Sequence, residues 1–358
     1  MTLEITVQRL HNQRLSHTNF KTPQAVVQWL GAVQAQDYAG AKWALAQRMT
    51  DTTDAALDQA LADGSILRTH LLRPTWHFVT PEDIRWLLKL TAPRVLTLLG
   101  FMDRQLELGK AIIKQSNALL IKALHGGKQL TRTELESIFQ ERGIKTTNLR
   151  MTNFMMHAEL DGIVCSGERK GKQFTYALLD ERAPQTKLLT HEEALAELAG
   201  RYFTSHGPAT MQDFIWWSGL TTTDARNGLE LIKSRLNNEM VKGQTYWFTN
   251  TAPRRKDKHL AVNLLPNYDE YVVGYTDRSA IFDVVHADKL DSRGSVLAQY
   301  TIVMNGQVVG TWKRTLKKNA VAIELAPFTK LTKAEHQEVA TTAERFGKFL
   351  ELPVLLNG

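Results

Sequence analysis

The chain has 358 residues, of which 43% are apolar, with a formal net charge of +7 and one cysteine, Cys165. A chain of this length holds roughly two to four domains with a sizeable core, and a single cysteine excludes an internal disulfide and a thiolate metal cluster. We find neither a secretion-type leader nor a run of about 18 apolar residues, so we expect no membrane span and place the protein in the cytoplasm.

The amino-terminal part predicts three short helices followed by a β-hairpin. Thr22 and Pro23 are the residue types of a helix N-cap and first helical position. Apolar residues then recur at the spacing of one buried helix face, at Val26, Trp29, Leu30 and Val33. Two more helices are expected over 38–48 and 53–62, and a hairpin over 66–79.

The same order of elements occurs twice more. A capping-box pattern from Thr131 to Glu134 begins a helix, a further helix is expected over 148–160, and a hairpin over 163–178. In the third copy Thr221 caps a helix and residues 246–248 close a short hairpin. Because three helices and a hairpin are the order of a winged-helix module, this repetition predicts three tandem winged-helix modules.

After His259 the pattern changes to short β-type runs. Strands are expected over 261–266, 271–275, 295–303, 307–312 and 320–325, with a hairpin turn at Asn305-Gly306 and a terminal helix over 333–350. The predicted fold is therefore α+β, with three winged-helix modules before an antiparallel β-barrel or sheet that carries a terminal helix. The expected domains cover residues 1–110, 111–186, 187–256 and 257–358.

The charge distribution of the first copy differs from that expected of a winged helix whose third helix binds in the DNA major groove. The third helix of a winged helix usually enters the major groove, but residues 51–63 contain four aspartates and neither Lys nor Arg. Such a helix is repelled by phosphates. Basic clusters lie instead on hairpins and near the C-terminal part: Arg68, His70 and Arg73; Arg169, Lys170 and Lys172; Arg254 to Lys258; Lys313, Arg314, Lys317 and Lys318. They indicate DNA held by hairpins and sheet, or else are solvated hairpin tips.

Gln34 and Gln36 are the catalytic candidates. They lie between the first two helices, and in an extended linker side chains two residues apart share a side, so both amides could converge on one point. Alternatively, the two glutamines cap helix ends. The neighbouring Asp37 could act as a base, although we favour a role as the cap of the second helix.

Five groups of residues carry a resemblance to a known family. They are VQAQD at 33–37, LRPTWHF at 72–78, HGPAT at 206–210 with FIWWSGL at 214–220, LLPNYD at 264–269 with GYTDR at 274–278, and VGTWKR at 309–314. Across nearly its whole length the chain resembles the AlkZ-like (YcaQ-type) DNA glycosylases, winged-helix proteins associated with repair of alkylated and crosslinked DNA. Gln34 and Gln36 match the Gln-x-Gln branch of that family rather than its Gln-x-Asp branch.

The resemblance implies three winged helices around a β-barrel and a monofunctional glycosylase whose two glutamines position a hydrolytic water. Its implied substrates are N7-alkylated purines in duplex DNA, sometimes within interstrand crosslinks. Glycosidic cleavage normally uses carboxylates, but an N7-alkylated purine already carries positive charge and leaves as a neutral base. Orienting water is then the main task, which an amide performs. We expect no metal, no cofactor and a monomer, cytoplasmic and associated with the nucleoid.

The residues expected to contact DNA are Arg68, Arg73, His77, Lys170, Lys172, Arg254, Arg255, Lys313 and Arg314. Against such a role for the first hairpin, the alternation of Trp76 and Phe78 is typical of a half-buried strand. Trp216 and Trp217 are interpreted as core residues rather than base-stacking ones. Four residues that match the family pattern could equally serve turns and ion pairs: Asp269, Tyr271, Asp277 and Arg278.

A second class of function stays open. A non-catalytic winged-helix protein, either a transcription regulator or a damage-binding factor, fits the same architecture. A regulator needs at least one basic recognition helix, and the acidic segment over 51–63 argues against it.

Overall fold

The computed structural model describes residues 4–17, 20–147, 149–186, 188–249, 261–290 and 295–357. Within them the predicted order of three helices and a hairpin occurs three times. We name the parts that contain it the first unit (20–79), the second unit (108–178) and the third unit (191–248), and we name residues 261–357 the C-terminal unit. Helix α1 (Ile5–Asn12) precedes the first unit, and α5 (Ile84–Gln105) joins the first unit to the second.

Side-chain caps begin the helices of the first unit. Thr22, Asp37 and Thr53 each accept a hydrogen bond from the backbone N–H three residues on. The helices are α2 (Pro23–Leu30), α3 (Tyr38–Ala46) and α4 (Asp54–Ala62). The hairpin of β2 (Leu67–Leu71) and β3 (Thr75–Val79) was predicted, whereas β1 (Val33–Gln34) was not; the sheet order is β1-β3-β2, all antiparallel.

The second and third units also match the predicted element order. The second contains α6 (Lys110–Leu124), α7 (Arg132–Glu141), α8 (Arg150–Leu160) and the sheet β4 (Leu130–Thr131), β6 (Thr175–Leu178), β5 (Val164–Ser166); α9 (Leu179–Arg182) follows it. Thr131 and Glu134 form the expected capping box. The third contains α10 (His191–Ser205), α11 (Met211–Ser218), α12 (Thr222–Ile232), the 3₁₀ turn η1 (Lys233–Arg235) and the hairpin β7 (Asn237–Val241), β8 (Gln244–Phe248).

The C-terminal unit is an open sheet, and the prediction of an antiparallel barrel is wrong. Five strands lie in the order β13-β12-β11-β10-β9, and β13 is parallel to β12. They are β9 (Val262–Leu265), β10 (Thr301–Met304), β11 (Gln307–Leu316), β12 (Val321–Pro327) and β13 (Val354–Asn357). The sheet has no need to close, because its apolar residues pack against α14 (Lys333–Leu350) and the first unit, in one core with Trp43, Trp312 and Phe346.

Three local predictions in this unit are also wrong. Residues 271–275 were expected as a strand, but Glu270–Val273 form the short helix α13, because buried Asp269 caps it through the N–H of Tyr271. The chain does not finish in α14 but returns as β13. The 3₁₀ turns η2 (Val284–Lys289) and η3 (Val296–Ala298) occupy the connection before β10, where one long strand over 295–303 was expected.

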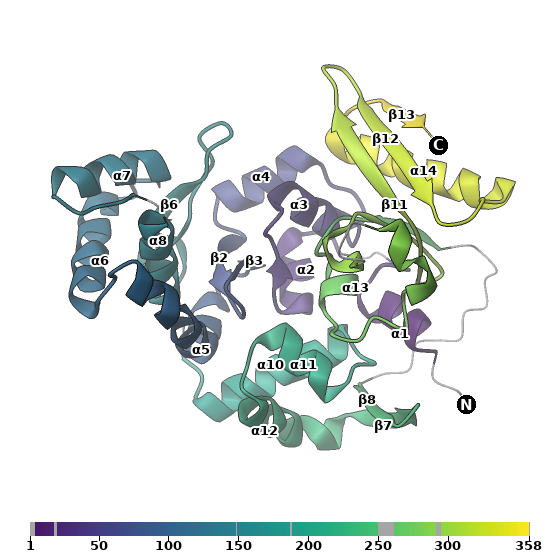
Figure 1. Cartoon of the computed structure of the whole chain (residues 1–358), viewed down its shortest axis with the longest axis horizontal. Coiled ribbons are helices and arrows are strands. Elements are labelled where there is room, and N and C mark those ends of the chain that lie inside the picture. Colours follow the sequence, from purple (N-terminus) through teal and green to yellow (C-terminus); the bar gives the residue numbers. More distant parts are fainter. Residues whose placement is uncertain are drawn as a thin grey trace.

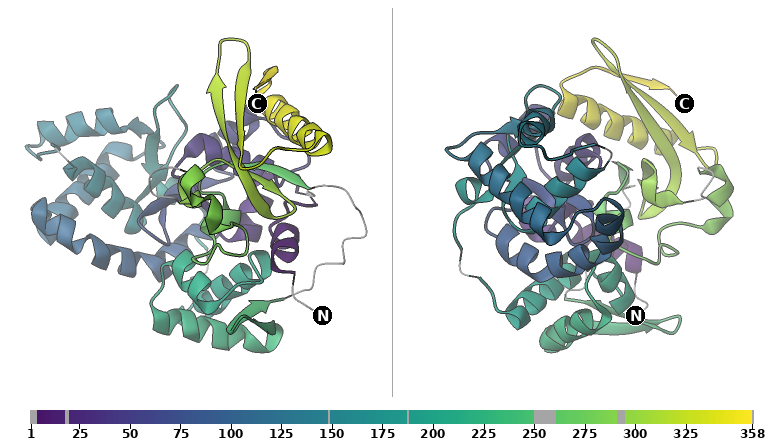
Figure 2. Two further views of the ribbon diagram at one scale, coloured as in Figure 1. Left: turned by 45° about the vertical axis from the view of Figure 1, so that its right-hand side comes forward. Right: turned by 60° about the vertical axis from the view of Figure 1, so that its left-hand side comes forward.

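The first unit lies at the centre of the molecule. Figure 1 shows the second unit at the left of the first, the third unit below it and the C-terminal unit at the right. Both views in Figure 2 show the yellow terminal helix lying against one face of the open sheet. One hydrophobic core joins the first unit to the C-terminal unit, another joins it to α5 and the third unit, and the second unit has a core of its own.

Within the described ranges, no helix is both long enough and apolar enough to span a lipid bilayer.

Candidate active site

Gln34 lies in the short strand β1, and Gln36 lies at the bend between β1 and α3. Gln34 pairs with His77 across β1 and β3, and the N–H of Ala35 donates to the carbonyl oxygen of Trp76 at 2.7 Å. Neither glutamine caps a helix, because Gly31 ends α2 and Asp37 begins α3. The helix-cap interpretation of the two glutamines is therefore wrong.

Gln34 is held at both its backbone and its side chain. Its N–H donates to Glu270 Oε1 at 2.8 Å, and its Oε1 accepts from an Arg73 terminal nitrogen at 2.8 Å. The residue is only 7% exposed. One lone pair of the carboxamide oxygen is thus committed to Arg73, and within the described part of the chain no residue accepts a hydrogen bond from the amide nitrogen of Gln34.

Glu270 is a buried carboxylate that collects donors from separate parts of the chain. Trp217 Nε1 donates to its Oε2 at 2.9 Å, and His206 Nε2 lies 3.3 Å from the same oxygen. Burial alone would raise the pKa of Glu270, but the hydrogen bonds from His206 and Gln34 outweigh it, and the pKa lies below its ordinary value. Sequence reasoning missed Glu270; its only signal is an acidic residue directly before an apolar run.

A second tryptophan connects Gln34 to the protein surface. Arg73 donates to the carbonyl oxygen of Trp216 at 3.2 Å, and its guanidinium lies 5.4 Å from that indole ring. Arg278 lies 5.6 Å from the same ring. Trp217 is fully buried, as expected of a core residue, but Trp216 is 38% exposed, so the core interpretation is wrong for Trp216.

His77 is enclosed behind Gln34. Burial and the nearby Arg73 lower the pKa of His77 to about 3, so the ring is neutral at physiological pH. Its Nδ1 lies 3.0 Å from the carbonyl oxygen of Thr75, which fixes the proton on Nδ1 and leaves Nε2 as an acceptor. Among the described residues none donates to that Nε2. Contact of His77 with the lesion stays a prediction, and here the side chain has no exposed surface.

Asp37 is a helix cap with a second partner. One carboxylate oxygen accepts from the N–H of Gly40 at 3.0 Å, which confirms the expected cap, and the other accepts from the hydroxyl of Tyr300. Tyr300 in turn accepts from Arg314 at 3.1 Å. The half-buried Arg314 of the C-terminal unit is therefore linked, through Tyr300 and Asp37, to the segment that carries the glutamines.

A cavity of about 450 Å³ opens beside Gln36, between the first and second units. The exposed Gln36 accepts weakly from the N–H of Trp76 at 3.4 Å. The residues that line the cavity are Gln36, Arg68, His70, Trp76, Arg132, Thr133, Thr152, Met155, Lys172, Gln173, Phe174 and Tyr176. None of them is acidic. The structure thus brings three of the predicted site residues, Gln36, Arg68 and Lys172, to one cavity.

The remaining predicted DNA contacts lie apart from this cavity. Lys170 is half exposed and pairs with Glu134 at 3.0 Å, and Lys313 is exposed on β11. Arg254 and Arg255 lie outside the described residues.

The acidic helix α4 faces internal cations. Lys42 Nζ lies 2.8 Å from Asp54 and 2.9 Å from Asp58, and Arg169 of the second hairpin lies 3.8 Å from Asp58. The aspartates of α4 therefore serve contacts between elements of the protein.

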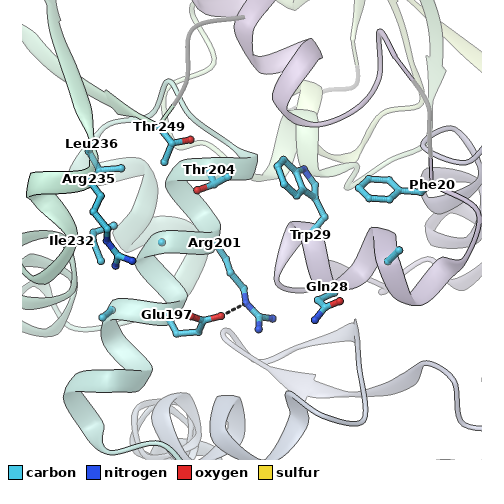
Figure 3. A pocket seen from close by; sticks show the side chains of 13 residues that line it. Phe20, Gln28, Trp29, Glu197, Arg201, Thr204, Ile232, Arg235, Leu236 and Thr249 are labelled. Atoms are coloured by element: carbon cyan, nitrogen blue, oxygen red, sulfur yellow. Dashed lines mark hydrogen bonds and ion pairs between the residues drawn. The ribbon is translucent and has the colours of Figure 1, made fainter.

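A second cavity, of about 470 Å³, lies between α2, α10 and η1 (Figure 3). Trp29 and Phe20 form one side of it, and Arg201 projects from α10 beside Glu197. Arg201 pairs with both Glu197 and Asp83, so its charge is already compensated. None of the predicted site residues lines this cavity. Over the described part of the chain, His, Cys, Asp and Glu side chains form no group of three or more that could hold a metal ion.

Comparisons with known proteins agree with this architecture. The family model described as DNA glycosylase AlkZ-like matches residues 27–349. The chain is 23% identical over 330 residues to the interstrand DNA cross-link repair glycosylase of Streptomyces sahachiroi, a match that covers 85% of each chain. The solved structure of the Streptomyces sahachiroi DNA glycosylase AlkZ shares the fold, with a TM-score of 0.79 at 21% identity over 99% of this chain and 98% of that one. Because the family model covers most of its length, the chain belongs to the AlkZ-like DNA glycosylase family.

Proposed function

We propose that this protein is a monofunctional DNA glycosylase that hydrolyses the N-glycosidic bond of N7-alkylated purines in duplex DNA. The observation that carries the proposal is the fixed position of Gln34, held by Glu270 and Arg73, with Gln36 two residues further on and lining a cavity. Family membership supports the glycosylase activity. The name of the Streptomyces relative extends the proposed substrates to interstrand crosslinks.

The proposed chemistry needs an oriented water rather than a strong acid. An N7-alkylated purine is a cation whose departure as a neutral base leaves an oxocarbenium-like sugar, so the leaving group needs no proton. Gln34 and Gln36 offer amide oxygens as acceptors and amide N–H groups as donors, which together can hold one water in a single orientation. Glu270 and Arg73 fix Gln34 so that the water is positioned before the substrate arrives.

The duplex would be held by elements around this site. We propose that the three units are winged-helix modules and that DNA contacts come from their hairpins and from the C-terminal sheet. The proposed contacts in the described part of the chain are Arg68, Arg73, His77, Lys170, Lys172, Lys313 and Arg314. We propose that the protein acts as a monomer and that its glutamines place it in the Gln-x-Gln branch of the family.

Release of 7-methylguanine from N7-methylated duplex DNA tests the proposal. The changes Gln34→Ala and Gln36→Ala should each slow release, and the double variant should slow it about 100-fold, because a misplaced water costs roughly that factor. Gln28→Ala is the matched control, since Gln28 is exposed on α2 and lines the other cavity. Wild-type release rates in the double variant would contradict the two-glutamine mechanism.

A further inference from the structure

We infer that the cavity beside Gln36 binds one phosphodiester group of the strand that carries the target base, with Arg68 as its inner ligand. The inference rests on the proposed function, because it assumes that the protein engages DNA at the glutamines. It adds the chemical group that the cavity receives and the residues that hold this group.

Arg68 is a buried cation with unused donors. The residue is 6% exposed, and its guanidinium carbon lies 4.5 Å from the ring centroids of both Trp76 and Phe174. Its Nε–H donates to the carbonyl oxygen of Ala35 at 3.2 Å. No described residue accepts a hydrogen bond from its two terminal nitrogen atoms. Burial lowers the pKa of Arg68 to about 10, so the side chain still carries its charge at neutral pH.

The walls of the cavity add positive charge without a matching acid. Arg132 and Lys172 also line it, and Arg132 pairs with Glu136 at 2.9 Å through Nε alone. The buried Glu159 is hydrogen-bonded to His70 and is not a lining residue. The nearby Glu159 attracts Arg68 and raises its pKa, but by less than burial lowers it. A buried charge requires a hydrogen-bonded partner, and among the described residues no carboxylate accepts from the terminal nitrogen atoms of Arg68. The Figure 3 cavity differs in this respect, because Arg201 there is already paired with Glu197.

Neutral donors complete the site. Thr133 lies in the first turn of α7, a helix of 10 residues, and Thr152 lies on α8. Because Glu134 already caps this end of α7, the site offers the hydroxyl groups of Thr133 and Thr152 rather than the helix end. Together with the free guanidinium donors of Arg68, these groups match an oxyanion, for which arginine is the preferred bidentate ligand.

A phosphate fits this cavity better than an extruded base does. A base needs an open aromatic face for stacking, whereas the rings of Trp76 and Phe174 already stack on Arg68. Arg68 is also bonded to Ala35, the residue between the two glutamines. A phosphodiester held by Arg68 would therefore fix the position of the neighbouring sugar relative to Gln36, because phosphate contacts set the register of a protein on DNA.

The test replaces single phosphates with neutral methylphosphonates in a duplex that contains one N7-methylguanine. Dissociation constants are measured for a series in which the methylphosphonate occupies each position of the lesion strand in turn. For the wild-type protein we expect one position beside the lesion to weaken binding about 10-fold or more, the size of one charge-assisted hydrogen bond. In Arg68→Gln the same methylphosphonate should cause no further loss, because its ligand is already absent.

Three companion variants keep the result interpretable. Lys172 is exposed at the rim of the cavity, and Lys172→Gln should also reduce the loss at that position. Arg68→Lys keeps the charge and should retain part of the sensitivity. Lys122→Gln removes an equivalent charge from the exposed face of α6 and should reproduce the wild-type profile.

Two results would overturn the inference. One is an unchanged methylphosphonate profile in both Arg68→Gln and Lys172→Gln. The other is that free 7-methylguanine competes for the cavity of the wild-type protein but not for that of Arg68→Gln. This result would show that the site binds the base. Failure of the proposed glycosylase activity is distinguishable, because it appears as missing base release while the binding profile is still measured.

Discussion

Single residues around Gln34 show how the fold prepares a polar site inside an apolar structure. Glu270 accepts hydrogen bonds from the backbone of Gln34 and from Trp217 of the third unit, and it lies in contact with His206. A buried carboxylate without these donors would be strongly unfavourable. Glu270 therefore ties the position of Gln34 to two other parts of the molecule, and a change in either part should reach the proposed water site.

His77 makes a prediction about pH. In the unfolded chain this side chain takes up a proton near its ordinary pKa of 6.5, whereas in the folded protein the pKa is about 3. The contribution of His77 to the free energy of unfolding is therefore fully present above pH 6.5. It is lost as the pH falls below that value, because only the unfolded state binds the proton. By linkage, the free energy of unfolding should fall by about 2 kcal/mol between pH 7 and pH 5 because of His77.

His77→Gln removes this titration and keeps an acceptor near the position of Nε2. Urea unfolding at pH 7 and pH 5 should show a decrease smaller by about 2 kcal/mol in the variant than in the wild type. Equal decreases in the two proteins would mean that the pKa of His77 is the same in the folded and the unfolded state.

Whole elements are positioned by buried ion pairs that the sequence does not reveal. Arg48 of the first unit donates to both carboxylate oxygens of Asp269, at 2.8 and 2.9 Å, and Asp269 caps α13. Helix α13 begins with Glu270, so this pair sets the place of the carboxylate that holds Gln34. From the sequence, Asp269 could serve either a turn or an ion pair, and the structure shows it in both roles.

Arg48→Met should therefore affect both stability and activity. It leaves Asp269 buried without its cation, which costs about 3 kcal/mol or more, and it should slow base release because α13 loses its anchor. Lys233→Met is the control, since the pair of Lys233 with Glu230 is about half exposed, at 47% and 56%, and such pairs contribute less than about 1 kcal/mol. If urea unfolding showed comparable losses of unfolding free energy in the two variants, the buried pair would have no special role.

Across the molecule, features that depend on neighbouring residues could be predicted from the sequence, whereas features that depend on contacts between distant segments could not. Helix caps such as Thr22 and Thr131, and the hairpin that contains Arg73, depend on neighbouring residues and could be predicted from the sequence. Whether the C-terminal sheet closes into a barrel depends on which of its edge strands pair, and amino-acid composition does not determine that pairing. The motif at residues 33–37 identified Gln34 and Gln36 as candidates. The role of Glu270 and the cavity beside Arg68 instead depend on contacts between units that are distant in sequence.

The distribution of the cores makes a prediction about cooperativity. The first unit shares one core with the C-terminal unit and another with the third unit. The buried residues of the main core of the second unit all lie between Leu108 and Leu178, and Cys165 is the one described residue of this unit that is buried in the core shared with the third unit. Elements that share a core should open together, and one with a separate core should open at lower free energy.

Hydrogen exchange measured over a series of low denaturant concentrations tests this directly. Amides of α6 and α7 should exchange through an opening of lower free energy, while those of α2, α10 and α14 should share one higher value, because none of these three can unfold without exposing a core that the first unit completes. Leu120→Ala, a cavity-forming change confined to the core of the second unit, should weaken protection in α6 and α7 by about 2 kcal/mol or more and leave α14 unchanged. Equal loss of protection in all five helices would instead indicate one cooperative unit, in which case the Arg68 cavity could not open and close separately from the segment that holds Gln34.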